Sequence, residues 1–501
     1  MSSFPFFVSQ GLRIAAACVI GLWLFRTVRW IHEQSQVAGV IVAAGIMLRA
    51  TIGLSLFWIS FLNLPLLRSS HWGDGFWALM GDARGYYRYA VTAIEVGLDT
   101  ITPGFSSPLF TKTLALWMHV VGVSPAAGLM LNVCLYTALA ALVTRMFKPH
   151  NQWRDDLPYI VGVGAFFLSP VLVIHGTQTL KEDLFNTLIG LLCISTLYAL
   201  RPIVYGIRHS RATFAASLMM VNAITFYLAG IRAYYAAIAW GVMVCVLSWF
   251  LLRQRLRRVP RYSIAAVLLL TAMWASYAYG AGPYYRGPTF ADADRLARGS
   301  EGKERNPAQA LYLTLVNMVE HARRGFWLTG GATNVSITAR RRGPGRSGYP
   351  APSSAAATEE DLSTESGATR SATDRLITLI VGLGVVFVPV SILKALGIVE
   401  FSGGRGLLPF ADADTMFLDI TLVAIAALLW TRRRAIGDRL PFVAFTVTLS
   451  LVTASLLGYV VTNFGTLFRM RAIVAVPMWM LGLALSNAPQ SDVVDRFSPR
   501  R

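Results

Sequence analysis

Charged residues are scarce in this sequence. Only 14% of its 501 residues are Asp, Glu, Lys or Arg, whereas 55% are hydrophobic. Soluble domains carry about 25% charged residues, so a soluble protein of this composition would have too little polar surface to present to water. The shortage of charge therefore excludes an ordinary soluble enzyme or binding module and indicates a membrane protein.

Cysteine is also rare, and repeats are missing. The four cysteines lie inside apolar runs without metal-ligand spacing, which is typical of small buried hydrophobic residues: Cys18, Cys134, Cys193 and Cys245. No repeat with a period of 20–50 residues occurs, which argues against a solenoid. The first apolar run begins near Leu12 and continues to Trp30 without the small-residue cleavage site of a signal peptide.

Long apolar runs fill the rest of the chain. Runs of about 20 residues match the thickness of the hydrocarbon layer, and only helices or closed barrels can span lipid. The runs are too long for barrel strands and do not alternate in polarity, so the sequence predicts an all-α, polytopic transmembrane bundle of about 11–13 helices, with outer-face loops and interfacial helices. The runs are 12–30, 37–66, 108–122, 126–147, 158–175, 184–204, 213–231, 233–252, 262–282, 376–399, 413–431, 440–462 and 471–487.

Two long gaps divide the chain into modules. We expect an N-terminal transmembrane module over 1–282, which contains a first outer loop at 68–107, and a C-terminal transmembrane module over 376–501. Between them lies a large outer loop, 283–375, whose Ser, Ala, Thr and Gly content predicts partial disorder. Residues 308–319 within that loop are apolar at helical spacing and predict a helix in the membrane interface.

The formal charge of +19 is concentrated in the gaps between the runs. Cytoplasmic loops are enriched in Lys and Arg, so the charge indicates contact with anionic lipid rather than with nucleic acid. All basic gaps fall in the cytoplasm only if two runs do not cross, and we expect these to be the short run 108–122 and the run 376–399, which Pro389 breaks. Eleven crossings then remain in a plasma (inner) membrane, with the N-terminus outside and the C-terminus inside. The basic gaps are Arg26–Arg29, Lys148–Arg154, Arg201–Arg211, Arg253–Arg261 and Arg432–Arg439.

This topology gathers the unusual polar clusters on the outer face. Arginine is disfavoured outside unless an anion holds it there, and its planar fork suits phosphate, so the clusters predict a phosphate site beside a carboxylate base. Each cluster also has a plainer interpretation, as a snorkelling side chain, a solvated turn or a lipid anchor. The clusters are Gly81–Ala90, Lys181–Asp183 with His175 and Gln178, Arg232–Tyr235, Tyr284–Arg286 and Asn463–Arg471.

These clusters resemble motifs of the GT-C superfamily of polytopic glycosyltransferases, which includes protein mannosyltransferases and aminoarabinose lipid A transferases. Residues 81–90 are similar to the Gly-Asp-x-x-x-Tyr-Tyr pattern of bacterial members, and Pro108–Phe110 to the proline-led helix that follows it. Ser169-Pro170 followed by Lys181–Asp183 resembles the segment that carries the second acidic position, and Asn463–Arg471 the Phe-Arg-x-Arg segment before the last helix.

The resemblance implies an inverting transferase that moves a sugar from a polyprenyl-phosphate donor to a glycan or glycolipid acceptor on the outer face. It implies Asp82 as the general base and Glu182 or Asp183 as the group that orients the acceptor. It implies no cofactor besides this donor. Because the sequence lacks an Asp-x-Asp pair, the need for a divalent metal is left open. Membrane lipid is the remaining partner. The implied substrate-binding residues are Tyr86, Tyr87, Lys181, Arg232, Arg286, Arg469 and Arg471, the two tyrosines as sugar platforms or interface aromatics.

Three other functions compete with this interpretation. A polysaccharide polymerase or ligase acting on lipid-diphosphate-linked chains would share the outer arginines but would not need Asp82 as a base. A transporter of lipid-linked sugars predicts internal repeats and charges at the midplane, and Arg49 is the one clear charge deep inside a predicted crossing. A scaffold without catalysis predicts that Asp82→Ala has no effect.

Overall fold

The computed structural model describes the chain in segments. Predictions about Arg286, the helix at 308–319 and the disordered loop concern residues outside these segments. The described residues are 3–66, 68–77, 80–101, 107–205, 210–253, 260–281, 335–337, 372–397, 399–401, 408–460 and 464–485.

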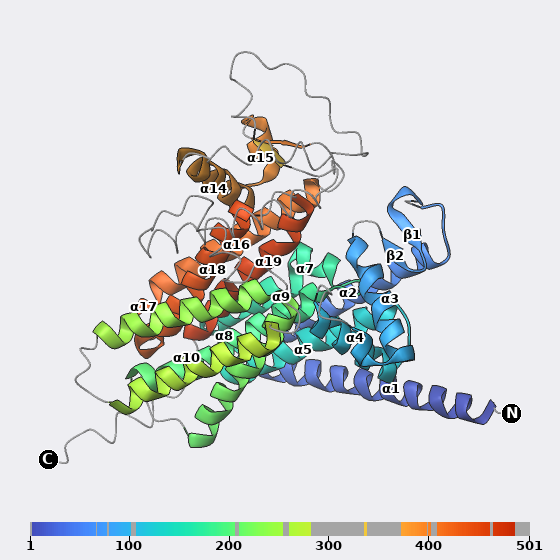
Figure 1. Ribbon diagram of the computed structural model, residues 1–501, viewed down its shortest axis with the longest axis horizontal. Coiled ribbons are helices and arrows are strands. Elements are labelled where there is room, and N and C mark those ends of the chain that lie inside the picture. The colour runs from blue at the N-terminus through green and yellow to red at the C-terminus, as the bar shows by residue number, and fades with distance from the viewer. Residues whose placement is uncertain are drawn as a thin grey trace, which may run out of the picture. The chain divides into compact units, whose positions relative to one another are not determined.

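The described part of the chain is nearly all helical, and nine of its helical segments are long and apolar enough to cross a membrane (Figure 1). The predicted fold class, a polytopic helical membrane bundle, is confirmed. α17 (Arg433–Ile436) and η8 (Gly437–Arg439) lead into α18, and η9 (Met480–Leu485) extends α19. The long helices are α1 (Ser3–Gln34), α2 (Gln36–Phe61), α5 (Ala126–Phe147), α8 (Lys181–Tyr205), α9 (Arg211–Arg253), α10 (Pro260–Ala281), α16 (Leu408–Thr431), α18 (Leu440–Val460) and α19 (Phe464–Trp479).

Shorter elements connect these helices. Strands β1 and β2 form an antiparallel hairpin, and β3 pairs antiparallel with β4. The short elements are η1 (Arg68–Ser70), β1 (His71–Gly73), β2 (Phe76–Trp77), α3 (Gly81–Val96), η3 (Leu98–Thr100), α4 (Pro108–Val121), α6 (Trp153–Leu168), α7 (Pro170–His175), β3 (Val335–Ile337), α14 (Ala372–Phe387), α15 (Val390–Ala395) and β4 (Val399–Phe401).

The run 158–175, predicted as one crossing, is divided in two. It forms α6 and α7, which meet at Ser169, where φ is −55° and ψ is 123°. A residue before proline is pushed out of the helical region, and Pro170 follows Ser169. Helix α6 has 16 residues and is therefore not among the long apolar segments.

The runs 213–231 and 233–252 form two helical stretches that share the label α9 and meet at Arg232. The backbone leaves the helical conformation there, with φ −148° and ψ 88°, as expected for two separate runs. The nine long segments correspond to eleven predicted crossings because α9 counts once for two runs and the divided run at α6–α7 is not counted.

The two runs predicted not to cross are short or broken. Helix α4 has 14 residues and is about 21 Å long, less than the ~30 Å of the hydrocarbon layer. The run 376–399 is interrupted at Pro389, which ends α14 and caps α15. Their lengths agree with interfacial or re-entrant segments, and their position in the bilayer stays a prediction.

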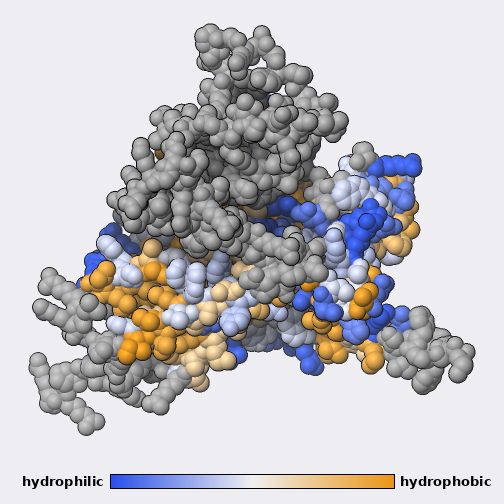
Figure 2. Space-filling view, viewed as in Figure 1, coloured by the Kyte–Doolittle hydropathy of each residue, from blue (hydrophilic) through white to orange (hydrophobic). Residues whose placement is uncertain are grey.

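Large apolar side chains are exposed along the long helices. Leu12, Trp249, Val267 and Val423 each expose 60–69% of their surface. Figure 2 shows extensive hydrophobic areas on the visible described surface. Because such areas are unfavourable in water, we infer that lipid covers them.

Residue contacts divide the chain into two compact units, and the division falls within α16, α18 and α19. The first unit comprises Met1–Gly287, Phe417–Thr453 and Ala472–Arg501, and the second Pro288–Met416 and Ala454–Arg471. In the first unit α9 packs against both α8 and α10, side by side in Figure 1.

Most of the basic gaps meet at one end of the first unit. Arg439 donates to Ala484 O at 2.9 Å at the same end. Because α8 runs about 37 Å from Lys181 to Tyr205, Lys181 lies at the opposite end from this cluster. The contacts that join the gaps are Gln36 N to Asn151 Oδ1 (3.3 Å), Arg432 Nη1 to Asp155 O (3.1 Å) and the ion pair of Arg201 with Asp438.

The second unit is held by close packing and by one buried arginine. A Cβ added to Gly382 would lie 1.8 Å from the carbonyl oxygen of Gly458, so only glycine allows α14 and α18 to approach this closely. Arg471 is 1% exposed; it donates to Ala411 O at 3.1 Å, to Thr415 Oγ1 and to Val385 O. Through these bonds Arg471 joins α14, α16 and α19.

Candidate functional site

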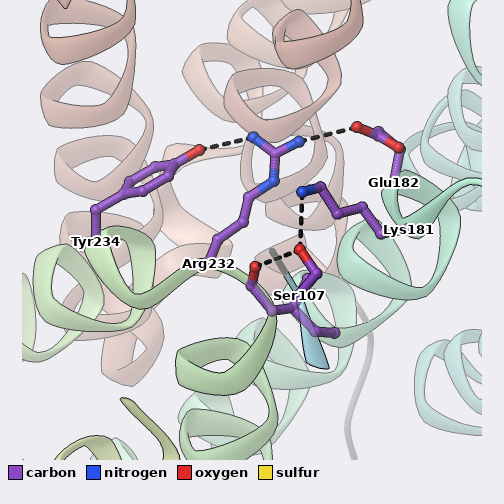
Figure 3. A network of polar contacts seen from close by, with 6 residues as sticks. Ser107, Lys181, Glu182, Arg232 and Tyr234 are labelled. Carbon is purple, nitrogen blue, oxygen red and sulfur yellow. Dashed lines mark hydrogen bonds and ion pairs between the residues drawn. The ribbon is translucent and has the colours of Figure 1, made fainter. Parts of the chain in front are cut away.

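The first turn of α8 carries a buried ion pair with α9. Glu182 Oε1 lies 2.9 Å from Arg232 Nη2, and their side chains are only 4% and 6% exposed. Arg232 Nη1 donates to the hydroxyl of Tyr234 at 2.8 Å. The non-helical backbone at Arg232 projects its side chain between the two halves of α9 and toward α8, so two of the predicted clusters meet here (Figure 3).

Lys181 connects this pair to the start of α4. Its Nζ donates to Ser107 Oγ at 2.7 Å, and Ser107 Oγ donates to the carbonyl of Ile231 at 2.9 Å (Figure 3). Ser107 has φ 70° and ψ 56°, the left-handed conformation that side chains other than glycine and asparagine seldom adopt. Ser107, in its strained conformation, therefore connects the start of α4 to α8 and to the bend of α9 through hydrogen bonds.

The paired tyrosines of α3 lie in different surroundings. Tyr86 is 4% exposed, and its ring centroid lies 5.4 Å from Lys181 Nζ and 5.1 Å from the ring of Phe110. Tyr87 packs on Phe76 and is half-buried. Burial raises the pKa of Tyr87, and the nearby Asp74 carboxylate raises it further, so this phenol stays neutral at physiological pH.

Helix α3 docks onto the turn that precedes α8. Thr179 Oγ1 donates to Ala83 O at 2.9 Å, and Ala83 packs with Leu180 in a small apolar core. Asp82 is exposed and lies in the first turn of α3, next to Ala83. The fold therefore brings the Asp82 segment beside the segment that carries Lys181 and Glu182.

Asp183 is bonded to a different helix from Glu182. Its Oδ1 accepts a hydrogen bond from the hydroxyl of Tyr136 on α5, and the residue is fully buried. Arg49 stacks its guanidinium 4.7 Å from the Tyr136 ring and donates to Phe167 O at 2.6 Å. Asp183 therefore belongs to an adjacent buried network rather than to the Lys181–Glu182–Arg232 site.

One buried hydrogen-bond donor of the site lacks a partner. Arg232 Nε makes no hydrogen bond within the described residues. The cations Lys181 and Arg232 lie together with the carboxylate of Glu182 in this site. Buried donors are normally satisfied, so the arrangement favours a bound ligand with oxygen acceptors.

The remaining candidates lie elsewhere. Arg471 is the buried brace of the second unit, and the half-buried Arg469 lies two residues before it on α19. Their convergence with Asp82 stays a prediction, and Arg286 lies outside the described residues. In the described segments, no group of three or more His, Cys, Asp or Glu side chains is placed to hold a metal ion.

Sequence reasoning missed two residues of these networks. Ser107 precedes a proline at the start of α4, where a serine is an ordinary N-cap, so its bond to Lys181 had no distinguishing signal. Tyr136 lies among apolar residues, and the polar Asn132 and Thr137 close to it were the only indication of a polar helix face. Comparisons with family models, with curated proteins and with solved structures found no match.

Proposed function

We propose that the protein is a membrane glycosyltransferase that uses a sugar carried on a polyprenyl phosphate. The observation that carries the proposal is the meeting of three polar clusters, from α3, α8 and α9, at the end of the first unit opposite its basic end. Two cations and an unsatisfied guanidinium donor make this a site for an anion with oxygen acceptors. A sugar-linked prenyl phosphate is such an anion.

In the proposed reaction an acceptor hydroxyl attacks the anomeric carbon of the donor. Asp82 takes the hydroxyl proton, the new glycosidic bond forms, and the bond between the anomeric carbon and the phosphate oxygen breaks. The electron pair of that bond leaves with the polyprenyl phosphate. Arg232 and Lys181 stabilise the charge that develops on the leaving phosphate, because their donors are already oriented in a site with little water.

One observation favours a second candidate, a transporter of lipid-linked sugars. Transporters bind their substrates at broken helices, and α9 is broken at the buried Arg232. A transporter would move the intact lipid-linked sugar between leaflets without releasing polyprenyl phosphate. A polymerase or ligase would act instead on a glycan chain linked to a lipid diphosphate.

The test is the composition of the lipid that copurifies with the protein, followed by turnover. We expect native mass spectrometry in mild detergent to detect a bound polyprenyl-phosphate sugar, and Arg232→Gln to lose it. In proteoliposomes with that lipid and a membrane glycan extract, we expect release of free polyprenyl phosphate. Movement of intact donor between leaflets without release would favour the transporter, and capture of only lipid diphosphates would favour the polymerase.

A further inference from the structure

Arg232 uses only part of its donor fork in the structure. Nη2 binds one oxygen of Glu182 and Nη1 binds Tyr234, whereas Nε makes no hydrogen bond within the described residues. Nε and Nη2 lie on the same edge of a guanidinium, the edge that binds carboxylate or phosphate with two parallel bonds. The contact with Glu182 therefore uses only one of the two donors on that edge.

Glu182 occupies this edge because an isolated buried cation is costly. Both side chains are more than nine-tenths buried, so each charge needs the other while no ligand is present. Glu182 presents one oxygen to this edge, whereas the two non-bridging oxygens of a phosphodiester can satisfy Nε and Nη2 together. An incoming phosphate therefore competes with Glu182 for Arg232 rather than binding beside an already neutral pair.

We propose that Glu182 is an internal counter-anion that the phosphate of the ligand displaces from Arg232. The proposal rests on the proposed function and deepens it, because it names the residue that sets affinity and charge selectivity for the donor. In the loaded site Arg232 is paired with phosphate, and the carboxylate of Glu182 is released toward the acceptor. Glu182 then accepts a hydrogen bond from the acceptor hydroxyl only when the donor is bound.

The neighbouring carboxylate provides a matched control. Asp183 lies one position further along α8 and is equally buried, but its carboxylate is bonded to Tyr136 on α5 and not to Arg232. Glu182→Gln and Asp183→Asn each replace a buried carboxylate in the first turn of α8 by an amide of the same size. Only removal of Glu182 eliminates the competitor for Arg232.

The experiment measures the Kd of polyprenyl methyl phosphate, a phosphodiester with one negative charge, for the full-length protein in detergent micelles. We expect Glu182→Gln to tighten binding by at least about tenfold, since loss of one partner leaves the other charge buried and unpaired until the ligand arrives. We expect Asp183→Asn not to tighten it. Glu182→Asp keeps the charge but shortens the side chain, and it should tighten binding by a smaller factor. This conservative variant serves as the test if Glu182→Gln does not fold.

The outcomes separate the two proposals. If the wild type binds the lipid, and the folded Glu182 variants bind it with equal or lower affinity, the displacement of Glu182 is overturned. The proposed function still stands in that case. No binding of the phosphate lipid to the wild type or to Glu182→Gln would overturn both. Binding of inorganic phosphate with the same affinity as the lipid would indicate a site for free phosphate, and the displacement would then apply to that ion while the proposed function fails.

Discussion

Tyr136 on α5 donates its hydroxyl hydrogen to Asp183 in the first turn of α8, within a region that is fully buried. Arg49 of α2 stacks on the ring of the same tyrosine and donates to two carbonyls at the end of α6. The start of α8 is thus fixed by charges on its α5 side, while its α9 side carries the proposed phosphate site. Stability and activity can therefore be separated by mutation.

Loss of Arg49 should destabilise the protein more than loss of the Tyr136 hydroxyl. Arg49→Met removes two buried, charge-assisted hydrogen bonds to Phe166 O and Phe167 O, each of which typically contributes about 1.5–3 kcal/mol. Tyr136→Phe removes one buried hydrogen bond and should cost about 1–3 kcal/mol. Thermal unfolding in detergent measures both changes. Arg29→Met is the control, because Arg29 forms an exposed pair with Glu33 that contributes little; equal losses for Arg29 and Arg49 would contradict the expectation.

Asp82→Asn should keep the fold and the binding of donor but abolish sugar transfer. The residue is exposed at the start of α3, so an isosteric change there costs little stability. Loss of a general base typically lowers the rate by roughly 10²–10⁴-fold. Asp74→Asn is the matched control, since Asp74 is an exposed carboxylate that pairs with Arg84 nearby. Transfer by Asp82→Asn at the wild-type rate would remove Asp82 as the base and favour a polymerase or a scaffold.

The fold class was predictable because long apolar runs admit few structures, and the gathering of basic gaps followed from charge alone. The break at Ser169-Pro170 was predictable in principle from the restriction that proline imposes on the residue before it. The break of α9 at Arg232 was also predictable, because this charge separates the apolar runs 213–231 and 233–252. The different partners of Glu182 and Asp183 could not be predicted, since they depend on which neighbour each face of α8 meets.

The two arginines of the last segment should differ in the effect of mutation. Arg471→Ala removes the donors that join α14, α16 and α19. It should lower the stability of the protein by several kcal/mol, because the buried acceptors lose their charged donor. Arg469→Ala should keep the fold, because Arg469 is only half-buried, and should weaken donor binding if Arg469 is a phosphate ligand. Thermal unfolding and donor titration distinguish the two effects. Full donor affinity in Arg469→Ala would refute the prediction that Arg469 binds the donor phosphate.

The sidedness of the site can be tested with single cysteines in a chain whose native cysteines are replaced. Glu95 on α3 and Val123 after α4 are exposed at the site end, and Asn151 is exposed at the basic end. We expect a membrane-impermeant maleimide to label Glu95→Cys and Val123→Cys on intact cells, and to label Asn151→Cys only after the membrane is opened. The 14 residues of α4 predict that it does not cross, and the 22 residues of α5 are enough to cross, so we expect the first two positions to share a side and the third to lie opposite.

Each alternative labelling pattern has a distinct meaning. Labelling of Asn151→Cys alone on intact cells would place the basic end outside, against the distribution expected of Lys and Arg, and would move the proposed site to the cytoplasmic face. Labelling of Glu95→Cys without Val123→Cys would mean that α4 crosses the bilayer despite its length. Only the expected pattern puts the Lys181–Glu182–Arg232 site in the outer leaflet. There a polyprenyl-phosphate sugar that has been moved across the membrane can meet a glycan acceptor outside the cytoplasm.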